Sequence, residues 1–263
     1  MAEASKKGLW GRRLSWLALA LSLGGIAAAL VAALGTGAGW WTYRAGLGVL
    51  RYALYAAVAG GVLAIVAWIV SRRSGARTGW INALALVAAV LFTGYLGNQI
   101  MTARSVPAIH DAATDLDDLP QFSRLTARAD NLENIPDEDD PKLAALDPES
   151  RWKALHRRAY SDLRPLRLAL PTAEVVSRAE QLARERGWEV ANVDGRAGIV
   201  EATATTLFFR FKDDVVIRVR PDPAQPGGSI VDMRSISRVG GSDVGVNAAR
   251  IRDFLRDLQA SAA

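Results

Sequence analysis

The residues best suited to chemistry lie near the C-terminus, in the stretch SISRVGGSDVGVN at 235–247. Two glycines and a Ser-Asp pair precede an amphipathic run, a pattern typical of a loop that opens a helix. Backbone N–H groups at a helix start carry partial positive charge and can hold a phosphate or a carboxylate. The candidate ligand-binding residues are Arg234, Ser237, Arg238, Ser242, Asp243, Asn247 and Arg250. An anion site of this kind requires a cleft in which these side chains converge.

A structural interpretation of the same stretch is simpler. Ser242 or Asp243 can cap the last helix by accepting the N–H groups that an anion would otherwise bind. The glycines allow the chain to turn. An Asp at the cap occupies the place of the anion, so we favour capping. The spacing also lacks the Gly-Lys-Ser/Thr ending of a Walker loop.

No catalytic constellation is found elsewhere in the sequence. Histidine occurs only at His110 and His156, and neither has a third ligand of comparable quality beside it, so His110-Asp111 predicts neither a metal site nor an acid–base pair. The chain has no Gly-x-Ser-x-Gly elbow and no cysteine. We therefore expect no catalytic residue, no metal and no cofactor, and we favour a protein that is not an enzyme. The alternative is an enzyme or sensor that uses the arginine-rich cluster on an anionic metabolite.

Three long stretches are nearly free of charge: Leu14 to Leu34, Tyr52 to Val70, and Trp80 to Ile100. Each is close to the roughly 20 residues that a helix needs to cross a bilayer. A soluble helix of that length would show a polar stripe. We predict three transmembrane helices at about 14–34, 50–70 and 80–100. The first stretch also fits a secretory signal peptide, but it is long for one and two more spans follow it.

Basic residues predict the orientation of these spans. The N-terminal segment 1–13 and the second loop are rich in them, whereas the first loop and its flank hold only Arg44 and Arg51. The basic residues of the two rich segments are Lys6, Lys7, Arg12, Arg13, Arg72, Arg73 and Arg77. By the positive-inside rule the N-terminus is cytoplasmic. Three crossings then place the C-terminal part in the periplasm or outside the cell, anchored in a bacterial inner membrane.

The overall basic charge follows from this topology. Residues 1–104 carry ten Lys/Arg and one acid, and residues 105–263 carry 22 Lys/Arg and 26 acids, which gives +9 and −4 and the total of +5. A nucleic-acid-binding domain would need a basic face, so we expect no nucleic acid partner. The spans have no Asp, Glu, Lys or His in their interiors, which argues against a channel or pump. The expected partners are the lipid bilayer and an envelope protein or an anionic small molecule.

The chain after the spans divides into two regions. Residues 105–146 carry many acids and few large apolar side chains, a composition that cannot offset the entropy cost of ordering, so we predict an acidic linker. Residues 147–263 predict helices at 147–158 and 172–186, strands at 188–193, 199–205, 214–220 and 230–237, and a final amphipathic helix. This order predicts an α+β domain with a mainly antiparallel sheet and flanking helices on one face.

The stretch TLFFRFK at 206–212 allows two interpretations. Leu207, Phe208, Phe209 and Phe211 lie between basic residues and suit contact with a membrane surface or an acyl chain, which makes a lipid-binding domain an alternative function. An ordinary strand is the favoured interpretation, because Leu207, Phe209 and Phe211 alternate and can point into a core.

Three motifs carry a family resemblance: Phe211 to Val216, Val231 to Gly240, and Ser242-Asp243 with Gly245 and Asn247. With these motifs, residues of about 171–258 resemble domain-of-unknown-function family 1499, a bacterial and plastid group. Much of that family has an Asn-Cys-Val-Ser-Ser stretch towards its front, whereas this chain has Ile109 to Phe122 there and no cysteine. A role tied to that cysteine therefore does not carry over. The resemblance implies a fold family and no reaction.

Overall fold

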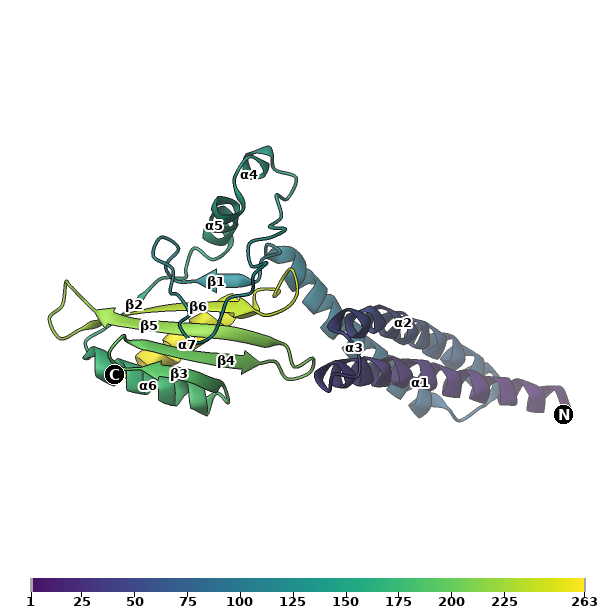
Figure 1. The fold of residues 1–263 in the computed structure, drawn as a ribbon. Helices are drawn as coiled ribbons and strands as arrows, with labels where there is room; N and C mark the ends of the chain where they lie inside the picture. Colours follow the sequence, from purple (N-terminus) through teal and green to yellow (C-terminus); the bar gives the residue numbers. More distant parts are fainter. Residues whose placement is uncertain (1, 263) are drawn as a thin grey trace. The chain divides into compact units, whose positions relative to one another are not determined.

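The protein is described by a computed structural model that covers residues 2–262, with side chains from residue 8 onward. The chain forms two compact units: a helical unit that ends at Met101 and also takes in Leu207–Arg210, and an α+β unit that holds Thr102–Thr206 and the chain from Phe211 onward. Figure 1 shows the elements of both.

Three long helices form the N-terminal unit: α1 (Ala2–Gly37), α2 (Tyr43–Ser74) and α3 (Gly79–Ser105). Each is long and apolar enough to cross a membrane, with mean hydropathies of 2.4, 2.3 and 1.7 in their most apolar parts. The three predicted spans are confirmed as helices, and each helix runs beyond its span. The end of α2 is set by a cap: Gly75 adopts φ 71° and donates its N–H to Ser71 O.

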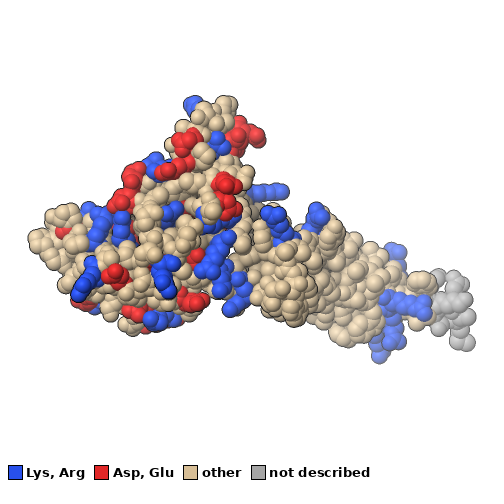
Figure 2. Space-filling model, viewed as in Figure 1, with Lys and Arg blue, Asp and Glu red and all other residues tan. Residues whose placement is uncertain are grey.

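Many apolar side chains of these helices point outward. Val90, Leu91 and Trp80 are more than half exposed in the structure, whereas a water-soluble bundle would bury such residues or leave them isolated. In Figure 2 the Lys and Arg side chains of the helical unit lie towards its two ends, and the band between them is uncharged. This distribution is the one that a hydrocarbon solvent requires.

Small residues allow α1 and α2 to approach closely. A Cβ added at Gly25 would lie 2.6 Å from Ala53 O, and one added at Gly60 would lie 2.4 Å from Ser22 Oγ. Lipid offers little hydrophobic driving force between helices, so close packing of backbones supplies much of their association. Hydroxyl pairs add to it: Ser15 Oγ donates to Thr78 Oγ1 at 2.9 Å, and Thr78 Oγ1 donates to Ser71 Oγ at 2.7 Å.

The second unit is an α+β domain, as predicted. Its strands are β1 (Asp111–Ala113), β2 (Leu166–Leu168), β3 (Glu189–Asp194), β4 (Ile199–Thr205), β5 (Lys212–Pro221) and β6 (Ser229–Ser237). They form one antiparallel sheet in the order β1-β6-β5-β4-β3, and β2 also pairs with β6. The helices are α4 (Pro141–Ala144), α5 (Pro148–Ala159), α6 (Thr172–Glu185) and α7 (Val246–Ser261). The two longest, α6 and α7, lie along the sheet (Figure 1).

Period-two alternation divides the residues of the sheet between its two faces. Ile217 on β5 lies opposite Met233 on β6, and both belong to the core that contains Val175 of α6 and Phe254 and Leu258 of α7. The intervening positions of β5 and β6 face the other way and include charged residues. One face of the sheet is therefore an apolar layer under two helices, and the other is polar.

The segment before residue 147 differs from the prediction of an extended linker. Its strand β1 pairs with β6, with Asp111 opposite Ile236. Ile109 and Ile135 are buried in the core, and the indole Nε1 of Trp152 donates to Asp111 O at 3.0 Å. The average composition of this segment is polar, but its few apolar residues are placed where the sheet and α5 bury them. The folded domain thus begins well before residue 147.

The strand interpretation of residues 206–211 is wrong. These residues form the turn between β4 and β5, closed by Thr206 N–H donating to Phe211 O at 2.9 Å. Arg210 has φ 56°, which a strand residue does not adopt. Leu207 is 77% exposed and Phe208 is 46% exposed, so the apolar pattern marks the tip of a hairpin.

Candidate functional site

The sheet separates the residues of the predicted anion cluster. Arg234 and Arg238 lie on the polar face of β6 and of the chain that follows it, where they contact Asp111 and Asp214. Ser237 lies on the opposite face and contacts Asn247 of α7. Because a sheet is impermeable to side chains, residues on its two faces cannot close around one ligand.

Each arginine on the polar face already has a carboxylate partner. Arg234 donates to the two oxygens of Asp111 at 3.1 and 2.7 Å, and both side chains are buried. Asn131 Nδ2 donates to the same carboxylate at 2.7 Å. Arg238 makes a bidentate pair with Asp214, with both distances 2.8 Å. An external anion would have to displace these carboxylates.

The helix side of the sheet holds the second part of the cluster. Asn247 accepts from Ser235 Oγ at 2.7 Å and donates to His110 O at 3.0 Å and to Ser237 Oγ at 2.9 Å. Arg250 donates to Asp213 at 2.5 Å and to Ser235 Oγ at 2.9 Å. These bonds fasten the start of α7 to the sheet, so the role that the geometry gives them is structural.

The N-cap residue of α7 is Gly245, and Asp243 has the hydrogen-bonding role that the favoured interpretation gave to Ser242 or Asp243. Its carboxylate accepts from Asn247 N at 2.7 Å and from Gly245 N at 2.9 Å, and burial raises its pKa while these N–H groups act against the rise. Ser242 Oγ accepts from Val244 N at 3.1 Å and closes the turn before the helix. The helix N-terminus is therefore occupied by the chain's own carboxylate.

A strap formed by residues 115–125 crosses the polar face of the sheet. Glu201 of β4 is fully buried and accepts from three consecutive backbone N–H groups, those of Ser123, Arg124 and Leu125, at 2.6–3.0 Å. Burial alone would raise the pKa of Glu201, but these bonds and the Ser123 hydroxyl outweigh burial and lower it. Glu201 was not a candidate from sequence, because an isolated acid in a strand has no recognisable partner in sequence.

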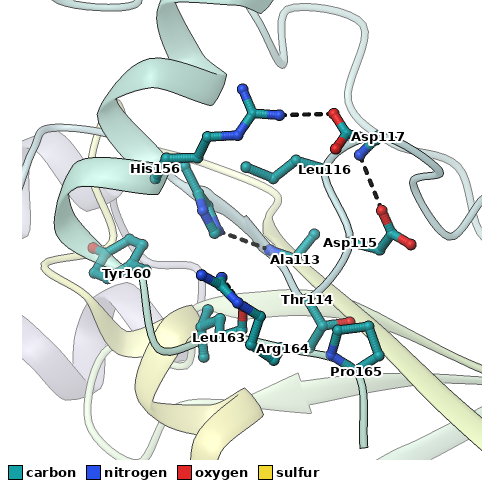
Figure 3. A pocket seen from close by; sticks show the side chains of 11 residues that line it. Ala113, Thr114, Asp115, Leu116, Asp117, His156, Tyr160, Leu163, Arg164 and Pro165 are labelled. Atoms are coloured by element: carbon teal, nitrogen blue, oxygen red, sulfur yellow. Dashed lines mark hydrogen bonds and ion pairs between the residues drawn. The ribbon is translucent and has the colours of Figure 1, made fainter.

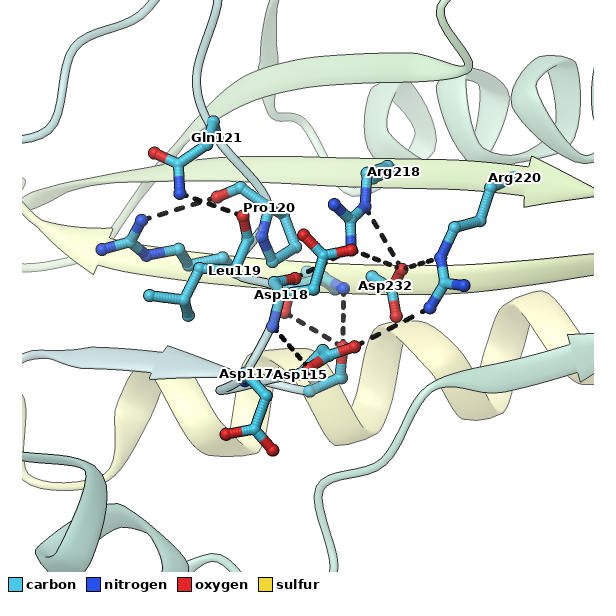
Figure 4. A network of polar contacts seen from close by, with 12 residues as sticks. Asp115, Asp117, Asp118, Leu119, Pro120, Gln121, Arg218, Arg220 and Asp232 are labelled. Carbon is cyan, nitrogen blue, oxygen red and sulfur yellow. Dashed lines mark hydrogen bonds and ion pairs between the residues drawn. The ribbon is translucent and has the colours of Figure 1, made fainter.

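The same face continues into a network of arginines and aspartates, shown in Figure 4. The buried carboxylate of Asp232 accepts from Arg218 at 3.0 Å and from Arg220 at 2.9 Å. Arg218 also pairs with Asp118 of the strap at 3.0 Å, and this guanidinium lowers the pKa of Asp118. The strap is thus bound to the sheet at both of its ends.

A cavity of about 430 Å³ opens beside β1 (Figure 3). It lies between the start of the strap, the last turn of α5 and the connection from α5 to β2. Its lining residues are Ala113, Thr114, Asp115, Leu116, Asp117, His156, Arg157, Tyr160, Leu163, Arg164 and Pro165. None of them was a candidate from sequence, since the acids were assigned to a solvated linker and His156 had no neighbouring ligand in the chain.

His156 belongs to the inner wall of this cavity. Its Nε2 accepts from the backbone N–H of Ala113 at 3.1 Å, so the neutral ring carries its proton on Nδ1. Burial lowers the pKa of His156 to about 4, against the favourable charge of Asp111. The ring packs edge-on against Trp152 and Tyr160. The inner wall is therefore aromatic and uncharged at neutral pH.

The rim of the cavity carries four charged residues, of which three have partners. Asp117 pairs with Arg157 at 2.7 Å. Asp115 accepts from the backbone N–H groups of Asp117 and Asp118 and lies 3.7 Å from Arg220. Arg164 donates to Leu163 O at 2.9 Å, and the described part of the chain provides it with no ion-pair partner.

Metal binding has no support in residues 8–262, where no group of three or more His, Cys, Asp or Glu side chains is placed to hold an ion. His110 and His156 lie in different surroundings. The Nδ1 of His110 lies 3.5 Å from Gly241 O, whereas His156 faces Ala113.

Comparison with known proteins identifies a family and no activity. A family model described as "Protein of unknown function (DUF1499)" matches residues 111–258, more than half of the chain. The match begins at β1, well before Pro171, so it includes the strap and the walls of the cavity. No match is found among curated proteins.

The buried pair on the polar face gives a first prediction. Replacing the arginine in Arg234→Met leaves Asp111 buried without its counter-ion, which should lower the unfolding free energy by about 3–5 kcal/mol. The double variant Asp111→Asn/Arg234→Met removes both charges and should recover part of that loss. Urea denaturation of the full chain in mild detergent, followed by tryptophan fluorescence, measures both.

Arg158→Met is the matched control, because Arg158 pairs with Glu138 at the surface. Such pairs contribute about 0–1 kcal/mol. If Arg234→Met is no more destabilising than this control, the Asp111–Arg234 pair is not the buried ion pair described above.

His156 gives a second prediction, on pH. Its pKa is about 4 in the folded protein and about 6.5 in an unfolded chain, so between these values the unfolded state binds more protons. The contribution of His156 to the unfolding free energy is therefore fully present above about pH 6.5. It should fall as the pH drops towards 4, by up to about 1.4 kcal/mol per pH unit.

His156→Gln isolates this contribution, because the amide can accept from Ala113 N–H and does not titrate. Denaturation curves of the two proteins from pH 7 to pH 4 should diverge as the pH falls. Parallel curves would show that His156 does not titrate with a lowered pKa.

Proposed function

Because the chain belongs to the DUF1499 family of proteins of unknown function, we propose its role from its own geometry. It is a membrane-anchored binding protein of the bacterial inner membrane, and its α+β domain lies on the extracytoplasmic side. The single observation that carries this proposal is the combination of three apolar, outward-facing helices with one folded domain that follows them.

The helices support the membrane anchor, and the basic residues support the orientation. Ten Lys/Arg and one acid occur in residues 1–104, and the basic residues are concentrated in the first part of α1 and around the end of α2. The positive-inside rule places those two segments in the cytoplasm. An odd number of crossings then carries the domain to the other side.

The arrangement of polar groups supports binding in preference to catalysis. Arg234, Arg238 and Arg250 each form an ion pair with a carboxylate of the domain. The enzyme or sensor hypothesis needed these side chains to converge on a ligand, and they lie on two faces of the sheet. The cavity beside β1 is one place where the domain leaves room for a small partner.

Membrane contact by the β4–β5 hairpin is a second candidate function. Leu207 and Phe208 are exposed at the tip of the turn, and Arg210 and Lys212 beside them are exposed as well. Apolar side chains flanked by cations suit the boundary between headgroups and acyl chains of anionic lipids. Phe209 and Phe211 are half-buried.

The orientation predicts the activity of reporter fusions. Alkaline phosphatase fused after Ala263 should be active, because this enzyme folds only outside the cytoplasm, and green fluorescent protein at the same point should be dark. A phosphatase fusion after Gly75, between α2 and α3, is the matched control and should be inactive. The reverse pattern would reject the extracytoplasmic location.

The hairpin predicts binding to vesicles. The α+β unit from Thr102 onward, checked for folding by circular dichroism, should co-float with vesicles that contain phosphatidylglycerol. Leu207→Ser/Phe208→Ser should weaken this binding about tenfold or more, since two apolar side chains lose their burial in lipid. Val239→Ser/Val246→Ser removes two other exposed apolar residues and should have little effect; equal losses in both variants would reject a specific role of the hairpin.

A further inference from the structure

We propose that the cavity beside β1 binds a small organic anion, a carboxylate or phosphate with a short apolar body, and that Arg164 pairs with its anionic group. This inference rests on the proposed binding function and names its site and the chemistry of the ligand. The site lies apart from the SISRVGGSDVGVN loop and shares none of the residues first predicted there.

The size and the walls of the cavity fit the apolar body of such a ligand. About 430 Å³ lies within the range of small-molecule sites, which is about 300–1,000 Å³. Ala113, Tyr160 and Leu163 are buried, and Leu116 and Pro165 are partly exposed. Figure 3 shows these side chains around the opening. Because Ala113, Tyr160 and Leu163 expose little surface, the apolar part of the wall is small and suits a short apolar body.

The charges of the rim favour an anion. Asp117 is neutralised by Arg157, and Asp115 accepts from two backbone N–H groups and has Arg220 nearby. Arg164 is the rim charge that no carboxylate of the described chain neutralises by an ion pair. A guanidinium presents several N–H donors in a planar fork, which matches a carboxylate or a phosphate.

The effects that disfavour an anion in the cavity are weaker than its pairing with Arg164. The cavity lies at the C-terminal end of α5, whose dipole disfavours an anion, but this effect is smaller than that of a charge-assisted bidentate hydrogen bond. The inner wall carries no charge. The Nε2 of His156 is engaged by Ala113 N–H, and its Nδ1–H and the Tyr160 hydroxyl are neutral groups with no hydrogen-bond partner among the described residues, so they attract an anionic group less than the guanidinium of Arg164 does. The anionic group therefore lies at the rim, with the apolar body inside.

The absence of cysteine in the sequence allows a direct test. Leu116→Cys places a single thiol on the cavity wall of the full chain, held in phosphatidylcholine nanodiscs. Benzoate or phenyl phosphate should slow its reaction with a maleimide, by about tenfold when the anion is present at ten times its Kd. Benzamide has the shape of benzoate without its charge and should give little protection.

Two controls make the test specific. Ala224→Cys, in the exposed turn after β5, should react at the same rate with and without each compound. In the Leu116→Cys background, Arg164→Gln should abolish protection by the anions, whereas Arg158→Gln should keep it. Arg158 lies on the same helix end and does not line the cavity. Circular dichroism checks that each variant is folded.

Nanodiscs that contain phosphatidylglycerol distinguish the sources of the anion. Protection of Leu116→Cys in these nanodiscs without added benzoate supports a lipid headgroup, and protection by soluble anions alone supports a free metabolite. No protection by any anion, equal protection by benzamide, or undiminished protection in Arg164→Gln would overturn the proposal. The fusions test the membrane location independently, so a failure of the site and a failure of the location can be told apart.

Discussion

The pairing of β1 with β6 is the interaction on which the rest of the domain depends. Three residues of β1 add to the edge of the sheet, and the Asp111–Arg234 ion pair and the Trp152 indole hold them there. A buried ion pair is favourable only when further hydrogen bonds satisfy its oxygens, and Asn131 supplies one. This short strand fixes where the strap begins, and the strap forms one wall of the cavity.

The polar face of the sheet shows how a domain can bury charge without using it for chemistry. Glu201 holds three backbone N–H groups of the strap, and Asp232 holds two arginines. Each of these buried charges is compensated by a partner within the domain. The proposed ligand site lies at the edge, where the strap leaves β1 and where Arg164 has no ion-pair partner among the described residues.

The two units keep their apolar side chains away from water in different ways. In the α+β unit, Phe254 of α7 and Ile217 of β5 are buried in one core. The charged residues of this unit face water or one another. In the helical unit, residues such as Leu91 and Val90 are exposed in the isolated chain and need hydrocarbon around them. The same apolar residue types thus form an internal core in one unit and a surface suited to lipid in the other.

The sequence by itself determined the features that depend on local periodicity and composition. These are the three apolar helices, the helices predicted at 147–158 and 172–186, the antiparallel sheet, the capping role given to Ser242 or Asp243, and the family. A helix has a period of 3.6 residues, a strand has a period of two, and a helix cap needs a single side chain. Each pattern can be recognised within a few positions of the sequence. Membrane orientation and ligand binding stay predictions of the charge pattern and the cavity.

Only the tertiary structure decided which distant residues meet. The segment 105–146 was read as a linker because its average is acidic, yet Ile109 and Ile135 reach the core. Arg234 and Ser237 are three positions apart, but the pleat sends them to opposite faces, so a cluster in sequence became two structural networks. The cavity is formed by three segments that meet only in the folded chain. Ala113 and His156, for example, are 43 positions apart, and a contact over such a separation produces no periodic pattern in the sequence.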